Sequence, residues 1–352
     1  MERAPEFRII GRASEEEKEK VREQFRGLLF SHLESLPPEA QELIRKFEYP
    51  KTKEEIAVIN FANQETNRLR KKLGLESFDI PLENYHILPP EKYREIMGDP
   101  NAYAITAFNQ QAIVFNAEAA RDNLPYFGAL ALHETLHLKG HLTLEVEEGK
   151  EGEMGEGEKL PIVTLYRAGV SVRALQKDIA EGRYHEHFGG LHEAIIETQT
   201  KKSFQKLLEL PELAEYKKWL MSEEARKIKE QISQEREKLG ENKIPEDEFI
   251  WVGNDGRSWA TFSYPRHRAV LDYVCREIQK EFPDKYESPE SVFEEFLKAH
   301  FTGGLLTIGK LVEKTFGKGS FRMLGNMTTE ETSAVLHLES LQKARQMQKK
   351  KT

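Results

Sequence analysis

Residues 133–137 have the sequence H-E-T-L-H, which is typical of a metal-dependent hydrolytic site. His133 and His137 are four positions apart, so on a helix both imidazoles share one face and can reach one metal ion. Glu134 lies beside the same site, where a carboxylate can take a proton from a water activated by the metal. The surrounding segment 124–141 is mostly apolar, where histidine and glutamate are costly to bury without partners. The pattern predicts a buried helix that carries a Zn²⁺ site.

A catalytic zinc ion usually has three protein ligands and one open position, so a third ligand is needed. His141 is one candidate, but it lies two turns along the same helix and is too far along the axis unless the helix bends. Glu193 is a second candidate, in the apolar helical segment G-G-L-H-E-A-I-I-E at 189–197. Glu197 follows one turn later and could accept the spare N–H of a ligand histidine. We favour Glu193 as the third ligand and Glu197 as the acid that supports a ligand histidine. The alternatives that stay open are three further histidines: His185, His187 and His192.

The two segments together resemble the thermolysin-like gluzincin metallopeptidases. The segment 189–197 is similar to the family's glutamate-ligand motif, G-A-x-N-E-A-x-S-D, with His192 in place of the usual Asn and Glu197 in place of the Asp. The resemblance implies that Glu193 is the third zinc ligand and that Glu197 supports a ligand histidine.

The segment 105–116, I-T-A-F-N-Q-Q-A-I-V-F-N, resembles the edge strand of the same family, N-A-F-W followed by a turn and a second strand. It carries Ala107 and Phe108 at the matching place, whereas Thr106 replaces the Asn and Asn109 the Trp. In the family this strand pairs with the extended peptide substrate. The resemblance therefore implies that Ala107 and Phe108 contact a peptide.

The resemblance, which covers roughly residues 102–200, also suggests groups that could stabilise an oxyanion. Tyr184 lies nine residues before Glu193, where the family has a tyrosine in this role. The family's second group is a histidine from the C-terminal lobe, which has no motif match here. His267 is a candidate for it, and the neighbouring Arg266 could bind a substrate carboxylate.

Composition limits the class of protein. The chain has 352 residues, with 52 Lys and Arg against 60 Asp and Glu and a formal net charge of −8. A single cysteine excludes an intramolecular disulfide scaffold and cysteine-rich zinc modules. The first residues lack the apolar segment of a signal peptide, and no stretch approaches 18 consecutive apolar residues. We expect a cytoplasmic protein whose partners are neither membranes nor, given the acidic balance, nucleic acids.

The pattern along the chain predicts a mostly helical protein with two hairpins. We expect an N-terminal helical region at 1–76, a catalytic core at 77–210 with an acidic Glu- and Gly-rich loop at 145–159, and a mostly helical C-terminal lobe at 211–352. The predicted hairpins lie at 102–116 and 249–264. The predicted helices lie at 13–35, 38–47, 52–74, just after Pro90, at 124–141, 162–180, 189–208 and 212–240, and within 266–346 with a break at 302–304.

The sequence thus predicts an α+β, zincin-like fold and a zinc-dependent metallopeptidase that hydrolyses peptide bonds of a peptide or protein substrate. In this reading His133, His137 and Glu193 hold Zn²⁺, and Glu134 is the general base. A zinc aminopeptidase or another amidohydrolase is one alternative. A zincin-like scaffold that acts as a sensor or protein-binding module is another. The sequence leaves the oligomeric state open.

Overall fold

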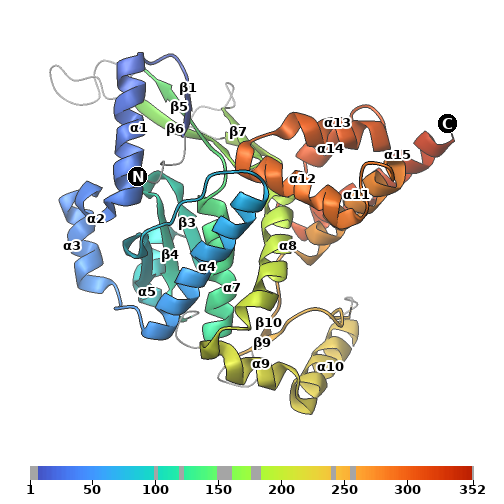
Figure 1. Ribbon diagram of the computed structural model, residues 1–352, viewed down its shortest axis with the longest axis horizontal. Helices are drawn as coiled ribbons and strands as arrows, with labels where there is room; N and C mark the ends of the chain where they lie inside the picture. The colour runs from blue at the N-terminus through green and yellow to red at the C-terminus, as the bar shows by residue number, and fades with distance from the viewer. Residues whose placement is uncertain are drawn as a thin grey trace.

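The computed structural model has a mixed α/β architecture in which helices dominate and the sheets are small (Figure 1). For residues 174, 175 and 184 the structure describes the backbone alone. Among the described helices, none is long and apolar enough to cross a membrane. The described residues are 7–98, 102–118, 123–148, 161–175, 184–238, 243–253 and 259–350.

The N-terminal region is helical, but its first helix is shorter than predicted. The capping box of Ser14 and Glu17 starts α1, which ends where the backbone changes direction at Ser31 (φ −140°). A second capping box, Thr52 with Glu55, starts α4. The elements are α1 (Glu15–Phe30), α2 (His32–Ser35), α3 (Pro38–Phe47), α4 (Lys53–Lys72), the 3₁₀ turn η1 (Leu82–Asn84) and α5 (Pro90–Met97).

A three-stranded sheet follows, and it contains the first predicted hairpin. Its strand order is β2 (Tyr85–Leu88), β4 (Ala112–Asn116), β3 (Ala104–Ala107). Strand β2 is parallel to β4, and β3 is antiparallel to β4 through the short turn η2 (Phe108–Gln110). The hairpin at 102–116 is confirmed. Among the described strands β3 pairs with β4 alone, so it is an edge strand.

The second sheet corrects two predictions. Its order is β1 (Arg8–Ile10), β5 (Leu142–Glu147), β6 (Ile162–Ala168), β7 (Ser171–Leu175), β8 (Tyr184–His187), with β1 parallel to β5 and the other pairs antiparallel. The helix predicted at 162–180 is wrong where the structure describes it, because β6 and β7 occupy that place. They are joined by a tight turn at Gly169, whose φ of +54° is unfavourable for other residues.

The start of the predicted acidic loop also belongs to this sheet. Glu145 pairs with Thr164 and Glu147 with Ile162, so the first three residues of 145–159 lie in β5. Residues 149–159 of that loop lie outside the described part of the chain.

Two central helices carry the motifs singled out in the sequence. Helix α7 (Leu124–Leu138) and helix α8 (Gly189–Leu207) pack against each other, and α4 and β3 pack against α7. In Figure 1 they lie side by side between the three-stranded sheet and the C-terminal helices. Helix α7 ends three residues before the predicted end at 141, because Lys139 and Gly140 turn the chain into β5.

The remaining chain forms a charged helical arm, a short hairpin and a C-terminal bundle. The second predicted hairpin is present as two-residue strands, and Cys275 is buried as core. The bundle packs on α8 through α11 and α12. The elements are η3 (Pro211–Leu213), α9 (Ala214–Leu220), α10 (Glu223–Lys238), β9 (Trp251–Val252), β10 (Trp259–Ala260), α11 (Pro265–Glu281), α12 (Pro289–Thr302), α13 (Leu305–Phe316), α14 (Ser320–Gly325) and α15 (Glu331–Lys349).

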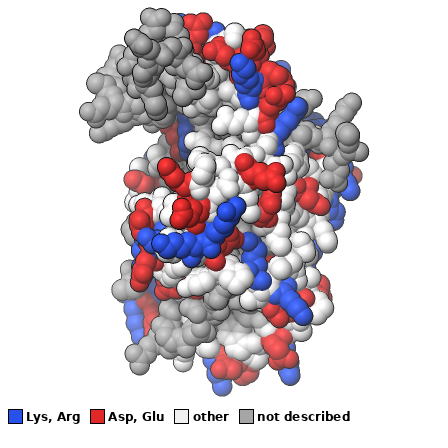
Figure 2. Space-filling model, turned by 90° about the vertical axis from the view of Figure 1, so that its left-hand side faces the viewer, with Lys and Arg blue, Asp and Glu red and all other residues white. Residues whose placement is uncertain are grey.

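Two hydrophobic cores divide the molecule differently from the three predicted regions. One core unites Leu29 and Phe127 with Phe262, and so joins all three regions. The other is centred on the C-terminal bundle and reaches Leu136 of α7 and Ile195 of α8. The two central helices therefore contribute to both cores. Figure 2 shows acidic and basic side chains interspersed over the face that includes the N-terminal helices.

Candidate metal centre

Three side chains from two helices bring their ligand atoms together. Nε2 of His133 and Nε2 of His137, both from α7, are 3.0 Å apart. Oε2 of Glu193, from α8, lies 3.4 Å from the first and 3.5 Å from the second. Ligands around a tetrahedral zinc at about 2.0–2.1 Å are separated by about 3.3–3.4 Å. The three separations therefore fit one ion, and two imidazoles with a carboxylate are a zinc ligand set.

The local sequence explains how Glu193 reaches this point. Helix α8 begins after Phe188, whose φ is +64°, with two glycines in its first turn. The N–H of Gly190 donates to the carbonyl of Met327, and a Cβ at this glycine would collide with the backbone of Thr328. Glycine thus lets the start of α8 approach the C-terminal bundle closely, which places Glu193 one turn later opposite α7.

The other ring nitrogen of each ligand histidine is held by a buried side chain. Nδ1 of His133 donates to Oε2 of Glu197 at 2.7 Å, and the backbone N–H of Ser263 donates to the other oxygen of that carboxylate. Nδ1 of His137 lies 3.0 Å from Nε2 of His192. Both contacts leave Nε2 of the ligand histidines available, since the proton resides on Nδ1. His192, one of the alternative ligands, therefore lies behind His137 and not in the ligand set.

A further histidine extends this support into the C-terminal bundle. His300 of α12 packs on His192, with ring centroids 5.3 Å apart, and its Nε2 donates to the carbonyl of Leu136 at 3.0 Å. Gly169 lies against both rings, and a Cβ there would collide with each of them. Burial lowers the pKa of His300 to about 3, so this ring is neutral. No motif in the sequence indicates this contact, which joins residues 164 positions apart.

The charges at the centre favour a bound cation. Burial alone lowers the pKa of His133, but the carboxylates of Glu197 and Glu193 outweigh it and raise that pKa well above its usual range. Burial raises the pKa of Glu193, yet His137 and His133 outweigh it and hold it well below its usual range. The metal-free centre thus binds a proton on His133 to balance its carboxylates. A divalent cation can take the place of that proton, because buried charges are paired or coordinate metals.

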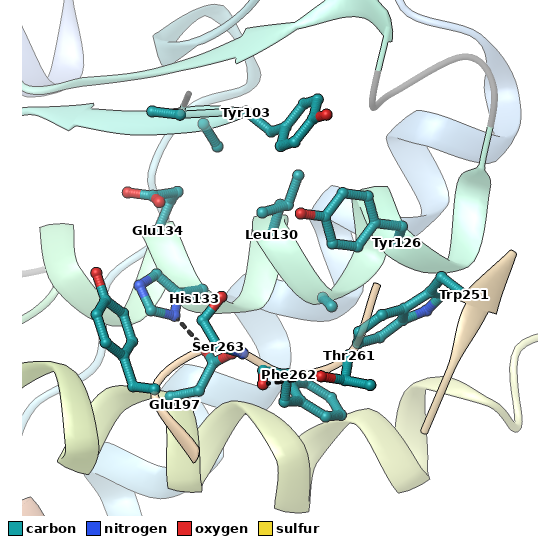
Figure 3. Close-up of a pocket in the computed structure, with 14 residues that line it drawn as sticks. Tyr103, Tyr126, Leu130, His133, Glu134, Glu197, Trp251, Thr261, Phe262 and Ser263 are labelled. Carbon is teal, nitrogen blue, oxygen red and sulfur yellow. Dashed lines mark hydrogen bonds and ion pairs between the residues drawn. The ribbon is translucent and has the colours of Figure 1, made fainter. Parts of the chain in front are cut away.

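The cleft beside the proposed ligands has a volume of about 300 Å³. Its walls are formed by α7, by strand β3 with the residues before it, and by residues 251 and 261–264. Figure 3 shows Glu134 on the side of α7 that faces Tyr103, whereas His133 points toward Glu197. Oγ1 of Thr106, on strand β3, donates to Oε2 of Glu134 at 2.7 Å. The cleft is lined by Ala102, Tyr103, Ala104, Tyr126, Ala129, Leu130, His133, Glu134, Glu197, Trp251, Thr261, Phe262, Ser263 and Tyr264.

Strand β3 borders this cleft, but not through the residues proposed for it. Side chains alternate along a strand, so Ala104 faces the cleft and Ala107 the opposite face of the sheet. Ala107 packs with Val114 in a small cluster there, which corrects its predicted place. Phe108 lies closer to the centre: its ring is edge-on to His137, with centroids 6.3 Å apart. Thr106, which departs from the family pattern, is the residue of this strand that contacts Glu134.

Other candidates from the sequence lie away from the cleft. His267 is fully buried, and its Nε2 donates to the carbonyl of Thr328 at 2.8 Å. Arg266 lies 3.6 Å from the carboxylate of Glu331 on α15. Neither lines the cleft, because the first turn of α11 directs both toward α15. Tyr264, just before α11, lines it instead.

Four candidates remain. His185 and His187 lie on strand β8 and are not part of the ligand set. His141 lies in the turn between α7 and β5, where its Nε2 is 2.9 Å from Oγ1 of Thr143. This histidine is therefore not part of the ligand set. Tyr184 begins strand β8, and its side chain lies outside the described part of the chain.

No protein-family model, curated protein or solved structure matches the chain. We therefore infer the function from the geometry of the centre and its cleft.

Proposed function

We propose that the protein is a zinc-dependent hydrolase that cleaves peptide bonds, with a zincin-like catalytic core. The observation that carries the proposal is the convergence of three ligand atoms, from His133, His137 and Glu193, within 4.8 Å, beside a cleft that is lined by His133 and Glu134. A ligand set without the adjacent glutamate would suit a structural metal, but Glu134 supplies the acid–base group that hydrolysis needs.

When bound, Zn²⁺ would polarise a substrate carbonyl and lower the pKa of a water molecule. Glu134 accepts the proton of the attacking water and passes it to the departing amine. The hydroxyl of Thr106 holds one oxygen of Glu134 and so fixes the carboxylate in the cleft. Glu197 and His192 keep the ligand imidazoles in the tautomer that ligation needs.

Strand β3 and the aromatic wall support a peptide as the substrate. An edge strand offers backbone N–H and C=O groups to an extended chain, which can add as a further strand. Ala104 places this edge at the cleft. The opposite wall includes Tyr126, Trp251 and Phe262, which favour apolar or aromatic side chains in the substrate. Tyr264 lines the same cleft and is a candidate donor to the oxyanion in addition to Tyr184.

Glu134→Gln separates a hydrolase from a binding scaffold. We expect about one zinc ion per chain in both the variant and the parent protein, and loss of peptide cleavage in the variant alone, measured with a peptide library and mass spectrometry. Glu193→Ala should lose most zinc, and His141→Ala should keep it as the matched control. Cleavage that persists at the parental rate in Glu134→Gln would refute the assignment. A zinc-loaded protein that binds library peptides without cleaving any would favour the scaffold.

A further inference from the structure

A second pair of buried histidines lies on the opposite face of the three-stranded sheet. His32 of α2 and His86 of β2 are 1% and 4% exposed, and their Nε2 atoms are 2.8 Å apart. Both line a cavity of about 340 Å³, which is also lined by Ala107, on the face of β3 that turns away from the catalytic cleft. The two histidines are 54 positions apart, and no sequence motif joins them.

The partners of the two rings fix where their protons lie. Nδ1 of His32 is 3.0 Å from the carbonyl oxygen of Leu28, and Nδ1 of His86 is 3.2 Å from Oε2 of Glu48. The other oxygen of Glu48, Oε1, accepts a hydrogen bond from Nζ of Lys51 at 2.5 Å, so Glu48 is an ionised carboxylate in an ion pair. A carbonyl and a carboxylate can only accept, so both Nδ1 atoms carry a proton. With one proton on each ring, the two facing Nε2 atoms are both acceptors, and two lone pairs at 2.8 Å repel each other.

A cation between or beside the two rings would remove this conflict, and the candidates are a proton and a metal ion. A ligand histidine usually donates its other N–H to a carboxylate or a backbone carbonyl, which is the arrangement of both rings here. The proposed zinc pair, His133 and His137, has the same form, with Nε2 atoms 3.0 Å apart and each Nδ1 held by a buried side chain.

We propose that His32 and His86 bind a divalent transition-metal ion through their Nε2 atoms. Two ligands at right angles and about 2.0–2.1 Å from a metal are about 2.9 Å apart, which matches the observed 2.8 Å and suits the tetragonal geometry of Cu²⁺ or Ni²⁺. The remaining coordination positions open onto the cavity, where Met97 and Gln110 carry further donor atoms. The ion would link α2 to β2 and so fasten the N-terminal helices to the sheet.

The test is a Cu²⁺ titration of the full-length protein that has first been loaded with Zn²⁺, followed by electron paramagnetic resonance. The expected spectrum is tetragonal, with hyperfine coupling to imidazole nitrogens, and it is lost in His32→Ala and in His86→Ala. Glu48→Ala removes the carboxylate behind one ring and should weaken Cu²⁺ binding by about 10–100-fold. His337→Ala, on α15 outside both clusters, should leave the titration unchanged.

Each outcome decides the proposal without reference to peptide cleavage. Circular dichroism and zinc content show whether the histidine variants are folded. If they are not, Glu48→Ala and the nitrogen coupling in the parent protein give the answer. Cu²⁺ binding that is equal in the parent, His86→Ala and Glu48→Ala, or a spectrum without imidazole coupling, would refute the metal site. Because the readout depends on His32 and His86, failure of the zinc centre and failure of this site are distinguishable.

Discussion

Replacing Glu197 with glutamine should weaken zinc binding, because this carboxylate accepts a hydrogen bond at each oxygen. Oε2 accepts from Nδ1 of His133 at 2.7 Å, and Oε1 accepts from the backbone N–H of Ser263. Glutamine has one accepting oxygen and one donating NH₂ group, so in either orientation one buried donor faces another donor. An unsatisfied buried donor costs about 1–3 kcal/mol. Loss of the partner of a ligand histidine typically lowers metal affinity about 10–100-fold, or ~1.4–2.7 kcal/mol.

The effect should grow with pH. In the metal-free protein a proton on His133 competes with zinc, because Glu197 and Glu193 outweigh burial and raise the pKa of that ring. Removing the charge of Glu197 lowers this pKa and weakens the competing proton. The loss of zinc affinity in Glu197→Gln is therefore partly offset near neutral pH and is fully visible at alkaline pH, where both proteins have lost the proton.

The measurement is a zinc dissociation constant from competition with a chelator at two pH values. Glu65→Gln is the matched control, since Glu65 is a buried carboxylate that pairs with Arg68 and Lys206, away from the centre. We expect it to lower stability and leave zinc affinity unchanged. A Glu197→Gln dissociation constant within about twofold of the parent at alkaline pH, under ~0.5 kcal/mol, would refute the role given to this carboxylate.

Three further predictions follow from contacts at the same centre. Thr106→Val keeps the shape of the side chain but removes the donor to Glu134, so kcat should fall by about tenfold with zinc content unchanged. Gly169→Ala forces a Cβ into the ring of His192 and puts a non-glycine residue at a φ of +54°. The free energy of unfolding should fall by ~1–3 kcal/mol and zinc binding should weaken, as thermal unfolding and metal analysis can measure. The raised pKa of His133 stabilises the metal-free protein at pH values below 6.5, the pKa of the ring in the unfolded chain. This stabilisation is lost as the pH rises through the pKa of the ring in the folded protein. Urea unfolding at neutral and alkaline pH should show the loss in the metal-free protein and not in the zinc-loaded protein.

Local sequence patterns were sufficient for some elements. The hairpin at 102–116 and the helices at 52–74 and 189–208 were predicted because their alternation, caps and periodicity lie within the element itself. The error at 162–180 has a physical reason. Strands β6 and β7 are stabilised by pairing with β5 and β8, which lie far from them in a local sequence window. A short apolar run by itself does not distinguish a strand from a buried helix.

The site shows the same limit. The spacing of Glu193 and Glu197 on one helix was readable from the sequence, and the structure brings Glu193 to the ligand histidines and Glu197 to Nδ1 of His133. The contact of His192 with His137 depends on how α7 and α8 cross, and that of Thr106 with Glu134 on the register of β3, so neither lies in a local pattern. Both residues stand where the sequence departs from the gluzincin pattern that it resembles, and that departure is the available signal.

The proposed metal centre is connected to the C-terminal bundle by its position between two cores. Helix α7 contributes Leu132 to one core and Leu136 to the other, and α8 likewise contributes Phe204 and Ile195. His133 and His137 lie on the stretch of α7 where the two cores meet, and Glu193 lies on the part of α8 that packs in the second core. Their supporting groups come from beyond these helices: the backbone at residue 263 holds Glu197, and the ring at residue 300 packs behind His192. The free energy that orients the ligand imidazoles is thus supplied partly by the packing of the C-terminal bundle, so any change that loosens the bundle should lower zinc affinity before it unfolds the chain.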